Sequence, residues 1–300
     1  MHLWCSMTAH HFTVDVEEYF QVAAFERYVA RRDWDRLSSR VVPQMEQLLT
    51  LLARHHTRAT CFVVGWVAER HRDPIGTMAR AGHEIASHGW DHARVTSLTP
   101  AQFRDSVRRS KQLLEEITGV AVVGFRAPNF SIVAGGEWAL DILLEEGYRY
   151  DSSLFPVRRP GYGYPMGEPD PHWIERPAGR LAEIPPATLS WAGVRLPAAG
   201  GGYFRLLPYG LVRAALRQSE GRGVPGTFYI HPWEIDPDQP WIDAPWLTRA
   251  RHYGGLRKTL PRLERLLTEF RFVPIRETLA TISSARPGRH RRVAFSESPA

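Results

Sequence analysis

Strand-like and helix-like segments alternate along most of this 300-residue chain, and this alternation limits the fold more than any other feature. Short β-rich runs, such as residues 11–16, 59–65 and 227–231, are followed by stretches in which apolar side chains recur with helical spacing. Such alternation builds a parallel sheet, because parallel neighbours are joined by helical crossovers. About seven strand–helix units favour a closed or nearly closed barrel. Since there is no internal repeat and no clear linker, we expect a single α/β domain.

Local signals locate several element ends. The segment Thr99–Gln102 has the pattern of a capping box with proline in the first helical turn. Ser38 or Ser39 is placed to cap another helix, whose apolar positions follow a 3.6 period: Val41, Val42, Met45, Leu48, Leu49 and Leu52. The Pro/Gly/Tyr-rich segment 156–179 interrupts the alternation, and we expect an ordered surface loop there.

Composition and charge narrow the class of protein. Hydrophobic residues make up 43% of the chain, which suffices for a substantial core. The net charge of +6 would suit a polyanion, but much of it lies in residues 286–292, which read RPGRHRR. A basic end of this kind is usually a solvated tail, so we expect no nucleic-acid partner. We divide the chain into a ragged N-terminus (1–10), one domain (11–284) and a basic, disordered tail (285–300).

Cysteine content and hydropathy indicate in which cellular compartment the protein is expected. The two cysteines, Cys5 and Cys61, do not make a disulfide framework, and we expect Cys61 to be a buried free thiol. No apolar run approaches the ~20 residues of a membrane-spanning helix. The first ten residues have neither the basic start nor the apolar core of a signal peptide, and Met7 is an alternative start. We therefore expect a cytoplasmic location and keep an extracytoplasmic one as the alternative.

Side chains suited to catalysis follow five of the expected strands. Asp15, His88, Arg126, Asp151 and His231 each lie at the carboxyl end of a strand-like run. In α/β barrels this face holds the active site. A single such residue is often a satisfied structural group, but five independent strand ends make that explanation weak. The sequence therefore predicts an active site at this face.

The segment Ser87–His92 contains a candidate metal-binding pair. If the backbone turns helically after the preceding strand, His88 and His92 fall on one face, about 5–6 Å apart at Cβ. Two imidazoles at this spacing can share one divalent ion. An isolated pair of this kind is not specific, so the prediction depends on the other strand ends.

Five motifs follow one another along the chain: Thr13–Glu17 (TVDVE), Ser87–His92 (SHGWDH), Arg126–Phe130 (RAPNF), Tyr150–Ser153 (YDSS) and Ile230–Glu234 (IHPWE). With them, about residues 10–280 resemble the polysaccharide deacetylases, the NodB-homology or family 4 carbohydrate esterases. The order and identity of the motifs make the resemblance highly specific. Two further segments resemble a narrower branch, found with exosortase-linked exopolysaccharide clusters: Gly200–Arg205 and Arg251–Tyr253.

The resemblance implies a fold, a cofactor and residue roles. The fold is a distorted (β/α)7-type barrel, and the cofactor is a divalent metal, most often zinc, held by a carboxylate and two histidines. His88 and His92 would be metal ligands. Asp15 would be the general base, and Arg126 would orient it by a charge-assisted hydrogen bond. His231 would be the general acid, and Asp151 would hold it in the correct tautomer and orientation.

One position departs from the family pattern. Its first motif usually has two adjacent aspartates, the base and then the ligand, whereas here Val16 stands in the second place. Related deacetylases place the metal-binding carboxylate two residues on, and residues i and i+2 of a strand face the same side. We therefore assign Glu17 as the third ligand. Two alternatives stay open: Asp15 binds the metal while Glu17 or Glu18 serves another role, or the metal is lost altogether.

The resemblance implies a metal-dependent hydrolase that removes N-acetyl groups from an N-acetylhexosamine-containing polysaccharide or oligosaccharide, in exopolysaccharide biosynthesis. A zinc ion would activate water, Asp15 would accept its proton and His231 would protonate the departing nitrogen. We expect four aromatic residues next to the motifs to stack on sugar rings: Trp90, Tyr203, Phe204 and Trp233.

Other functions are weighed against this one. A metal-independent cyclic-amide hydrolase on the same fold is favoured by the altered first motif. A glycan-binding protein without catalysis ranks last, because the acid, base and histidine positions are all present. A serine acyl-enzyme is disfavoured because no G-x-S-x-G segment occurs. The glycines 200–202 are not followed by the Lys-Ser/Thr of a phosphate-binding loop. The sequence does not give an oligomeric state.

Overall fold

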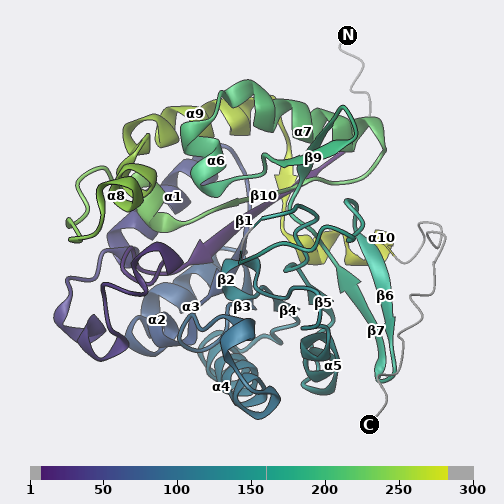
Figure 1. The fold of residues 1–300 in the computed structure, drawn as a ribbon, viewed down its shortest axis with the longest axis horizontal. Coiled ribbons are helices and arrows are strands. Elements are labelled where there is room, and N and C mark those ends of the chain that lie inside the picture. Colours follow the sequence, from purple (N-terminus) through teal and green to yellow (C-terminus); the bar gives the residue numbers. More distant parts are fainter. Residues whose placement is uncertain (1–7, 160, 283–300) are drawn as a thin grey trace.

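The protein is an α/β barrel in which a curved, mainly parallel sheet is surrounded by helices (Figure 1). The computed structural model describes residues 8–159 and 161–282. The main sheet has the strand order β10-β1-β2-β3-β4-β5-β7-β6, and β11 pairs with β1. The strands of this sheet are β1 (His10–Val16), β2 (Thr60–Val63), β3 (Glu84–Ser87), β4 (Gly124–Phe125), β5 (Tyr150–Asp151), β6 (His172–Arg176), β7 (Gly179–Glu183), β10 (Thr227–Ile230) and β11 (Phe272–Val273).

The barrel closes between β7 and β10 through isolated bridges instead of a continuous ladder. Pro186 bridges to Thr227, and Gly200 bridges to Tyr229. Between these two bridges the chain forms a separate antiparallel hairpin of β8 (Thr188–Trp191) and β9 (Val194–Pro197). The predicted distorted barrel is therefore confirmed, and the irregular closure is its distortion.

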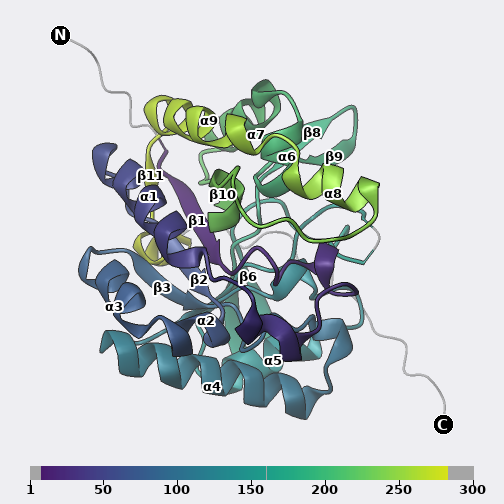
Figure 2. The same cartoon turned by 90° about the vertical axis from the view of Figure 1, so that its left-hand side faces the viewer.

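Helices cover the outside of the sheet, and the longest, α4, runs along one side of the molecule (Figure 2). The helices are α1 (Val41–Arg54), α2 (Gly65–Arg70), α3 (Arg72–Arg80), α4 (Pro100–Thr118), α5 (Trp138–Glu145), α6 (Gly201–Leu206), α7 (Tyr209–Gly221), α8 (Trp246–Tyr253), α9 (Leu256–Glu269) and α10 (Leu279–Ile282). Among the described residues, no helix is both long enough and apolar enough to cross a bilayer.

The helix ends show which local signals were decisive. At α4 the predicted capping box forms, with Thr99 and Gln102 bonded reciprocally. At α1 no serine side chain caps the helix. The buried Glu18 carboxylate does so instead, because its oxygens accept from the backbone N–H groups of Arg40 (3.0 Å) and Val41 (3.4 Å). An anion at a helix N-terminus also suits the helix dipole.

The core forms where the sequence predicted it, with one local exception. The apolar positions of α1 pack into the main core, where each fully buried leucine contributes about 2 kcal/mol. Cys61 is a buried free thiol, and burial raises its pKa to about 12. The expected loop 156–179 is wrong in part, because it contains β6, which pairs antiparallel with β7. This edge strand is only partly buried, so it carries no clear hydrophobic alternation.

Candidate active site

Three of the five predicted strand-end residues line one cavity, whereas Arg126 and Asp151 are buried behind it. Its volume is about 340 Å³, and its lining includes Asp15, His88 and His231 at the carboxyl ends of β1, β3 and β10. The same cavity is lined by residues from later in the chain, among them Arg205 and Arg251. Because the strands run parallel, their carboxyl ends open on one face and bring these side chains together.

Three buried side chains in this cavity form a candidate metal centre. Potential ligand atoms of Glu17, His88 and His92 all lie within 4.8 Å of one another. The shortest separation, between Glu17 Oε2 and His92 Nε2, is 2.5 Å. The condition of a helical turn after β3 is not met, because His92 has φ +55° in an irregular segment. The two imidazoles nevertheless converge, with ring centroids 5.2 Å apart.

The tautomer of His88 suits metal binding. Its Nδ1 donates to the carbonyl oxygen of Arg126 at 2.8 Å, which leaves the Nε2 lone pair free for a ligand bond. Burial lowers the pKa of His88 to about 4, so the imidazole is neutral at physiological pH. A neutral imidazole fixed through its other nitrogen is the usual form of a metal-bound histidine.

Glu17 is an ionised carboxylate whose second oxygen lies against the His92 ring. Burial raises its pKa, but the charges of His92 and His231 outweigh this and lower the pKa to about 2. Trp233 Nε1 donates to Oε1 at 3.1 Å, whereas the buried Oε2 makes no hydrogen bond of normal geometry among the described residues and lies 2.5 Å from His92 Nε2. Burying a charged carboxylate oxygen costs free energy unless a cation binds it. One carboxylate and two imidazoles are a ligand set of catalytic zinc sites, so the residues fit a divalent ion.

Arg126 fixes Asp15 as the sequence predicted. Arg126 is fully buried, and its Nη1 donates to Asp15 Oδ1 at 2.6 Å and to Thr13 Oγ1 at 2.8 Å. Its other terminal nitrogen donates to Ser152 Oγ at 2.9 Å. These contacts hold one oxygen of Asp15, and the second oxygen lies 3.8 Å from His231 Nε2. Asp15 thus faces the cavity in a fixed orientation.

The residue that orients His231 is Glu234, and the expectation that Asp151 does so is wrong. His231 Nδ1 donates to Glu234 Oε1 at 2.7 Å, and the same oxygen accepts from the His231 backbone N–H at 3.1 Å. Burial lowers the pKa of His231, but Glu17, Glu234 and Asp15 together raise it to about 9. The histidine therefore carries a proton at neutral pH, with Nε2 towards the cavity.

Asp151 is fully buried and belongs to a different contact network. It accepts from the Ser153 hydroxyl at 2.5 Å, and Ser153 Oγ in turn accepts from the backbone N–H of Ala127 at 2.7 Å. Glu183 on the neighbouring strand is its partner in the sheet register. Burial raises the pKa of Asp151. Asp151 therefore braces the segment that follows Arg126, whereas His231 bonds to Glu234.

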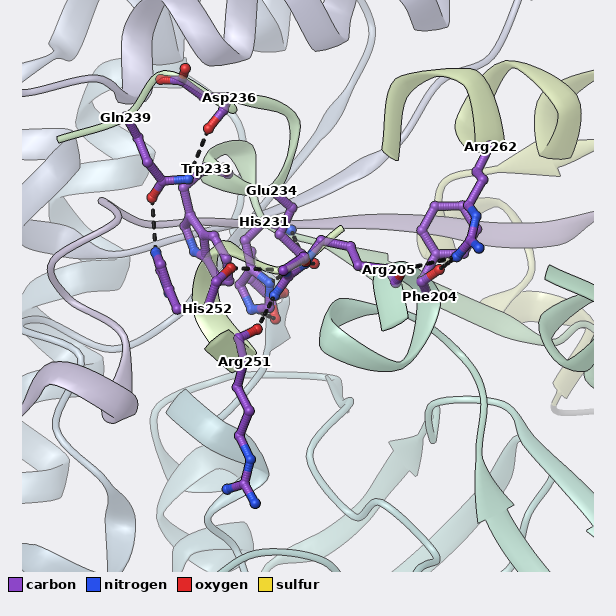
Figure 3. A network of polar contacts seen from close by, with 12 residues as sticks. Phe204, Arg205, His231, Trp233, Glu234, Asp236, Gln239, Arg251, His252 and Arg262 are labelled. Carbon is purple, nitrogen blue, oxygen red and sulfur yellow. Dashed lines mark hydrogen bonds and ion pairs between the residues drawn. The ribbon is translucent and has the colours of Figure 1, made fainter. Parts of the chain in front are cut away.

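A buried arginine on α6 holds Glu234 and the end of α8 (Figure 3). Arg205 Nε donates to Glu234 Oε2 at 2.6 Å. Its terminal nitrogens donate to the backbone carbonyls of Arg251, His252 and Gly254. One guanidinium thus joins the partner of His231 to the helix that closes one side of the cavity.

The four predicted sugar-stacking aromatics do not form a platform. Trp90 lies outside the cavity lining and packs against Arg109. Phe204 is buried in the core, and Tyr203 bonds through its hydroxyl to Tyr162, which lines the cavity. Trp233 does line the cavity, but it is only 5% exposed. Its ring stacks on His231 and His252, and its N–H orients Glu17.

Sequence reasoning missed Glu234, Arg205 and Tyr162. Glu234 had a signal, since a carboxylate three residues after a histidine can return to it across one turn, here the 3₁₀ helix Pro232–Ile235. Arg205 was singled out only as part of the segment Gly200–Arg205, without a role, and Tyr162 had no signal, because their contacts join segments that are distant in sequence.

A family model described as polysaccharide deacetylase matches residues 34–143, which include His88 and His92 of the cavity lining and the buried Arg126. This part of the chain is thus similar to the polysaccharide deacetylases. Residues 152–280 match a second model, described as a domain of unknown function (DUF3473). That second part contributes Arg205, His231 and Glu234.

Curated relatives match over about a third of this chain. A peptidoglycan deacetylase of Helicobacter pylori is 33% identical over 110 residues, which are 36% of this chain and 36% of that protein. A peptidoglycan-N-acetylglucosamine deacetylase of Bacillus cereus is 24% identical over 121 residues, which are 35% and 43% of the two chains. The matched part is less than half of either relative.

Solved structures show that the fold is shared over the whole chain. A Mycobacterium smegmatis protein assigned to the polysaccharide deacetylases has a TM-score of 0.65 at 21% identity, covering 100% of this chain and 97% of that one. The allantoinase PuuE has a TM-score of 0.58 at 17% identity, covering 94% and 92% of the two chains. At these identities the likeness concerns the fold alone.

Proposed function

We propose that this protein is a divalent-metal-dependent N-deacetylase that acts on an N-acetylhexosamine-containing polysaccharide. The observation that carries the proposal is one cavity that holds a three-ligand cluster (Glu17, His88 and His92), a fixed carboxylate (Asp15) and a protonated histidine (His231). The relatives named as peptidoglycan deacetylases support the reaction class. A role in exopolysaccharide biosynthesis and a cytoplasmic location are further predictions from the sequence.

Each group has a task in amide hydrolysis. A divalent ion bound by the cluster, most often zinc in such ligand sets, would supply Lewis-acid polarisation and a water of lowered pKa. Asp15 accepts a proton from the attacking water, and Arg126 keeps its carboxylate oriented for this transfer. His231 donates its Nε2 proton to the nitrogen of the leaving sugar amine. Glu234 holds the opposite ring nitrogen and stabilises the imidazolium.

Acetate release provides the direct test of this proposal. The protein is freed of metal by chelation, reloaded with zinc, and incubated with N-acetylglucosamine oligomers and with a cyclic amide such as allantoin. We expect acetate from the oligomers with the loaded protein only. The absence of both bound metal and acetate release across several acetylated glycans would contradict the proposal. Full hydrolysis of the cyclic amide by the metal-free protein would support the metal-independent alternative.

A further inference from the structure

Arg251 is a cavity-lining cation with no counter-ion. It lies near the end of α8, it is exposed, and it lines the same cavity as Glu17 and His231. In the part of the chain that the structure describes, its guanidinium has no carboxylate partner within ion-pair distance. Figure 3 shows this side chain extending away from the network around Arg205.

Hydrogen bonds from the buried Arg205 hold the backbone around Arg251 in place. Arg205 donates to the carbonyl oxygens of Arg251 (3.3 Å), His252 (2.8 Å) and Gly254 (2.5 Å). Arg205 itself is buried and paired with Glu234. The free guanidinium therefore starts from a fixed point in the cavity wall, which reduces the entropy lost when it binds a ligand.

The other charges of the cavity are already matched. Asp15 pairs with Arg126 at 2.6 Å, and Glu234, behind the wall, pairs with Arg205 at 2.6 Å. Glu17 lies 2.5 Å from His92 and belongs to the proposed metal cluster. Arg251 thus leaves one positive charge in the cavity wall that no protein carboxylate compensates.

We propose that Arg251 binds an oxyanion of the substrate, a carboxylate or a phosphate close to the sugar that carries the acetamido group. This inference rests on the proposed function, and it adds that the substrate is an acidic glycan and not a neutral homopolymer. The planar fork of a guanidinium suits either oxyanion, since both accept two parallel N–H bonds. A neutral N-acetylated chain would leave this cation without a partner.

The same helix offers a matched control. Arg249 lies two residues before Arg251, does not line the cavity, pairs with Asp243 at 3.6 Å and covers the ring of Trp241. Substituting either arginine by glutamine removes one positive charge from α8. Only Arg251→Gln removes it from the cavity.

Calorimetric binding to the metal-free protein tests the inference without relying on catalysis. The ligands are a neutral N-acetylglucosamine tetramer, an acidic tetrasaccharide that alternates N-acetylglucosamine with glucuronate, and N-acetylglucosamine with and without a 1-phosphate. For wild type and Arg249→Gln we expect at least one acidic ligand to bind about fivefold more tightly than its neutral counterpart. This advantage should vanish in Arg251→Gln and shrink as salt is raised. Preference for the uronate or for the 1-phosphate identifies the source of the oxyanion.

Equal affinity for neutral and acidic ligands in wild type, or no measurable binding of either acidic ligand, would overturn the inference. An advantage that survives in Arg251→Gln would do the same. Acetate release by the zinc-loaded protein from the two tetrasaccharides is measured separately. Its absence would contradict the proposed deacetylase while leaving the binding comparison intact.

Discussion

Two regions of the cavity are built in different ways. The floor consists of Asp15, Glu17, His88 and His92 at the ends of β1 and β3, with the buried Arg126 behind Asp15 at the end of β4. The wall consists of residues from the second half of the chain, between α6 and α8: Arg205, His231, Trp233, Arg251 and His252, with Glu234 behind them. Floor residues lie at the ends of parallel strands of one sheet, so the sheet register positions them. Wall residues lie in α6, after β10 and in α8, and hydrogen bonds from the buried Arg205 join α6 to Glu234 and to the backbone of α8.

Because of this difference, a substitution in the floor should have a local effect, whereas one in the wall should not. A change in the floor should remove metal binding or catalysis while the sheet stays intact. A change at Arg205 should affect several wall residues at once, because its bonds reach Glu234 and three backbone carbonyls.

The largest effect is expected for the floor carboxylate. Glu17→Gln should weaken zinc binding about 100-fold and abolish acetate release, because an ionised ligand becomes a neutral amide. The control is Asp91→Asn, since Asp91 lies between the two histidines in sequence but pairs with Arg31. Zinc titration with a competing chelator measures both variants. Unchanged zinc affinity in Glu17→Gln would transfer the ligand role to Asp15.

The next largest effect distinguishes Glu234 from Asp151 as the residue that orients His231. Glu234→Gln should lower turnover of an acetamide about 100-fold and leave hydrolysis of an aryl acetate nearly unchanged, because a phenolate leaves without a general acid. The loss of the Glu234 charge should also lower the pKa of His231, so the alkaline limb of activity moves to lower pH. Asp151→Asn should stay within about threefold of wild type, since Asp151 bonds to Ser153 and not to His231. The opposite ranking of the two variants would restore Asp151 as the orienting residue.

A substitution in the wall is expected to have a smaller effect, which concerns the stability of the protein. Arg205→Gln should lower the free energy of unfolding by about 3 kcal/mol, because Glu234 is left as an unpaired buried charge. The double variant Arg205→Gln/Glu234→Gln should recover part of that loss. Arg213→Gln, at an exposed pair with Glu269, should change stability by less than about 1 kcal/mol. Urea unfolding measures wild type, these three variants and the single variant Glu234→Gln, and additive losses would show that Arg205 and Glu234 are not coupled.

The smallest effect concerns Trp90, which was expected to stack on a sugar. Its ring packs over Arg109 with the guanidinium 3.3 Å from the ring centroid, and it lies against Gly65. Trp90→Ala should therefore cost about 2 kcal/mol of stability and leave KM unchanged. A higher KM without loss of stability would return Trp90 to the substrate site.

The floor could be predicted from the sequence because its residues sit in short motifs at strand ends. Alternation along β1 placed Asp15 and Glu17 on one side, and the two histidines lie in one short segment after β3. Their local backbone was not predictable, since His92 adopts a positive φ that no propensity indicates. The convergence of the motifs mattered more than the conformation of any one segment.

In the wall, His231 and Trp233 were predicted as site residues, but the contacts that hold the wall were not, because they join segments far apart in the chain. Arg205 reaches Glu234 and the carbonyls of α8 only after the chain has closed around β10. Asp151 was assigned to His231 by resemblance, yet fully buried Asp151 bonds to Ser153, while Glu234 lies one turn from His231. Aromatic residues next to motifs were expected to meet the substrate, whereas most of them pack within the protein.

The most direct test is the position of the ion in a crystal of the zinc-loaded protein, located by its anomalous scattering. The account predicts one peak per chain, about 2.0–2.2 Å from Glu17 Oε2 and from one ring nitrogen each of His88 and His92, with Asp15 still bonded to Arg126. A peak coordinated by Asp15 in place of Glu17, or no peak in a protein that still releases acetate, would contradict it.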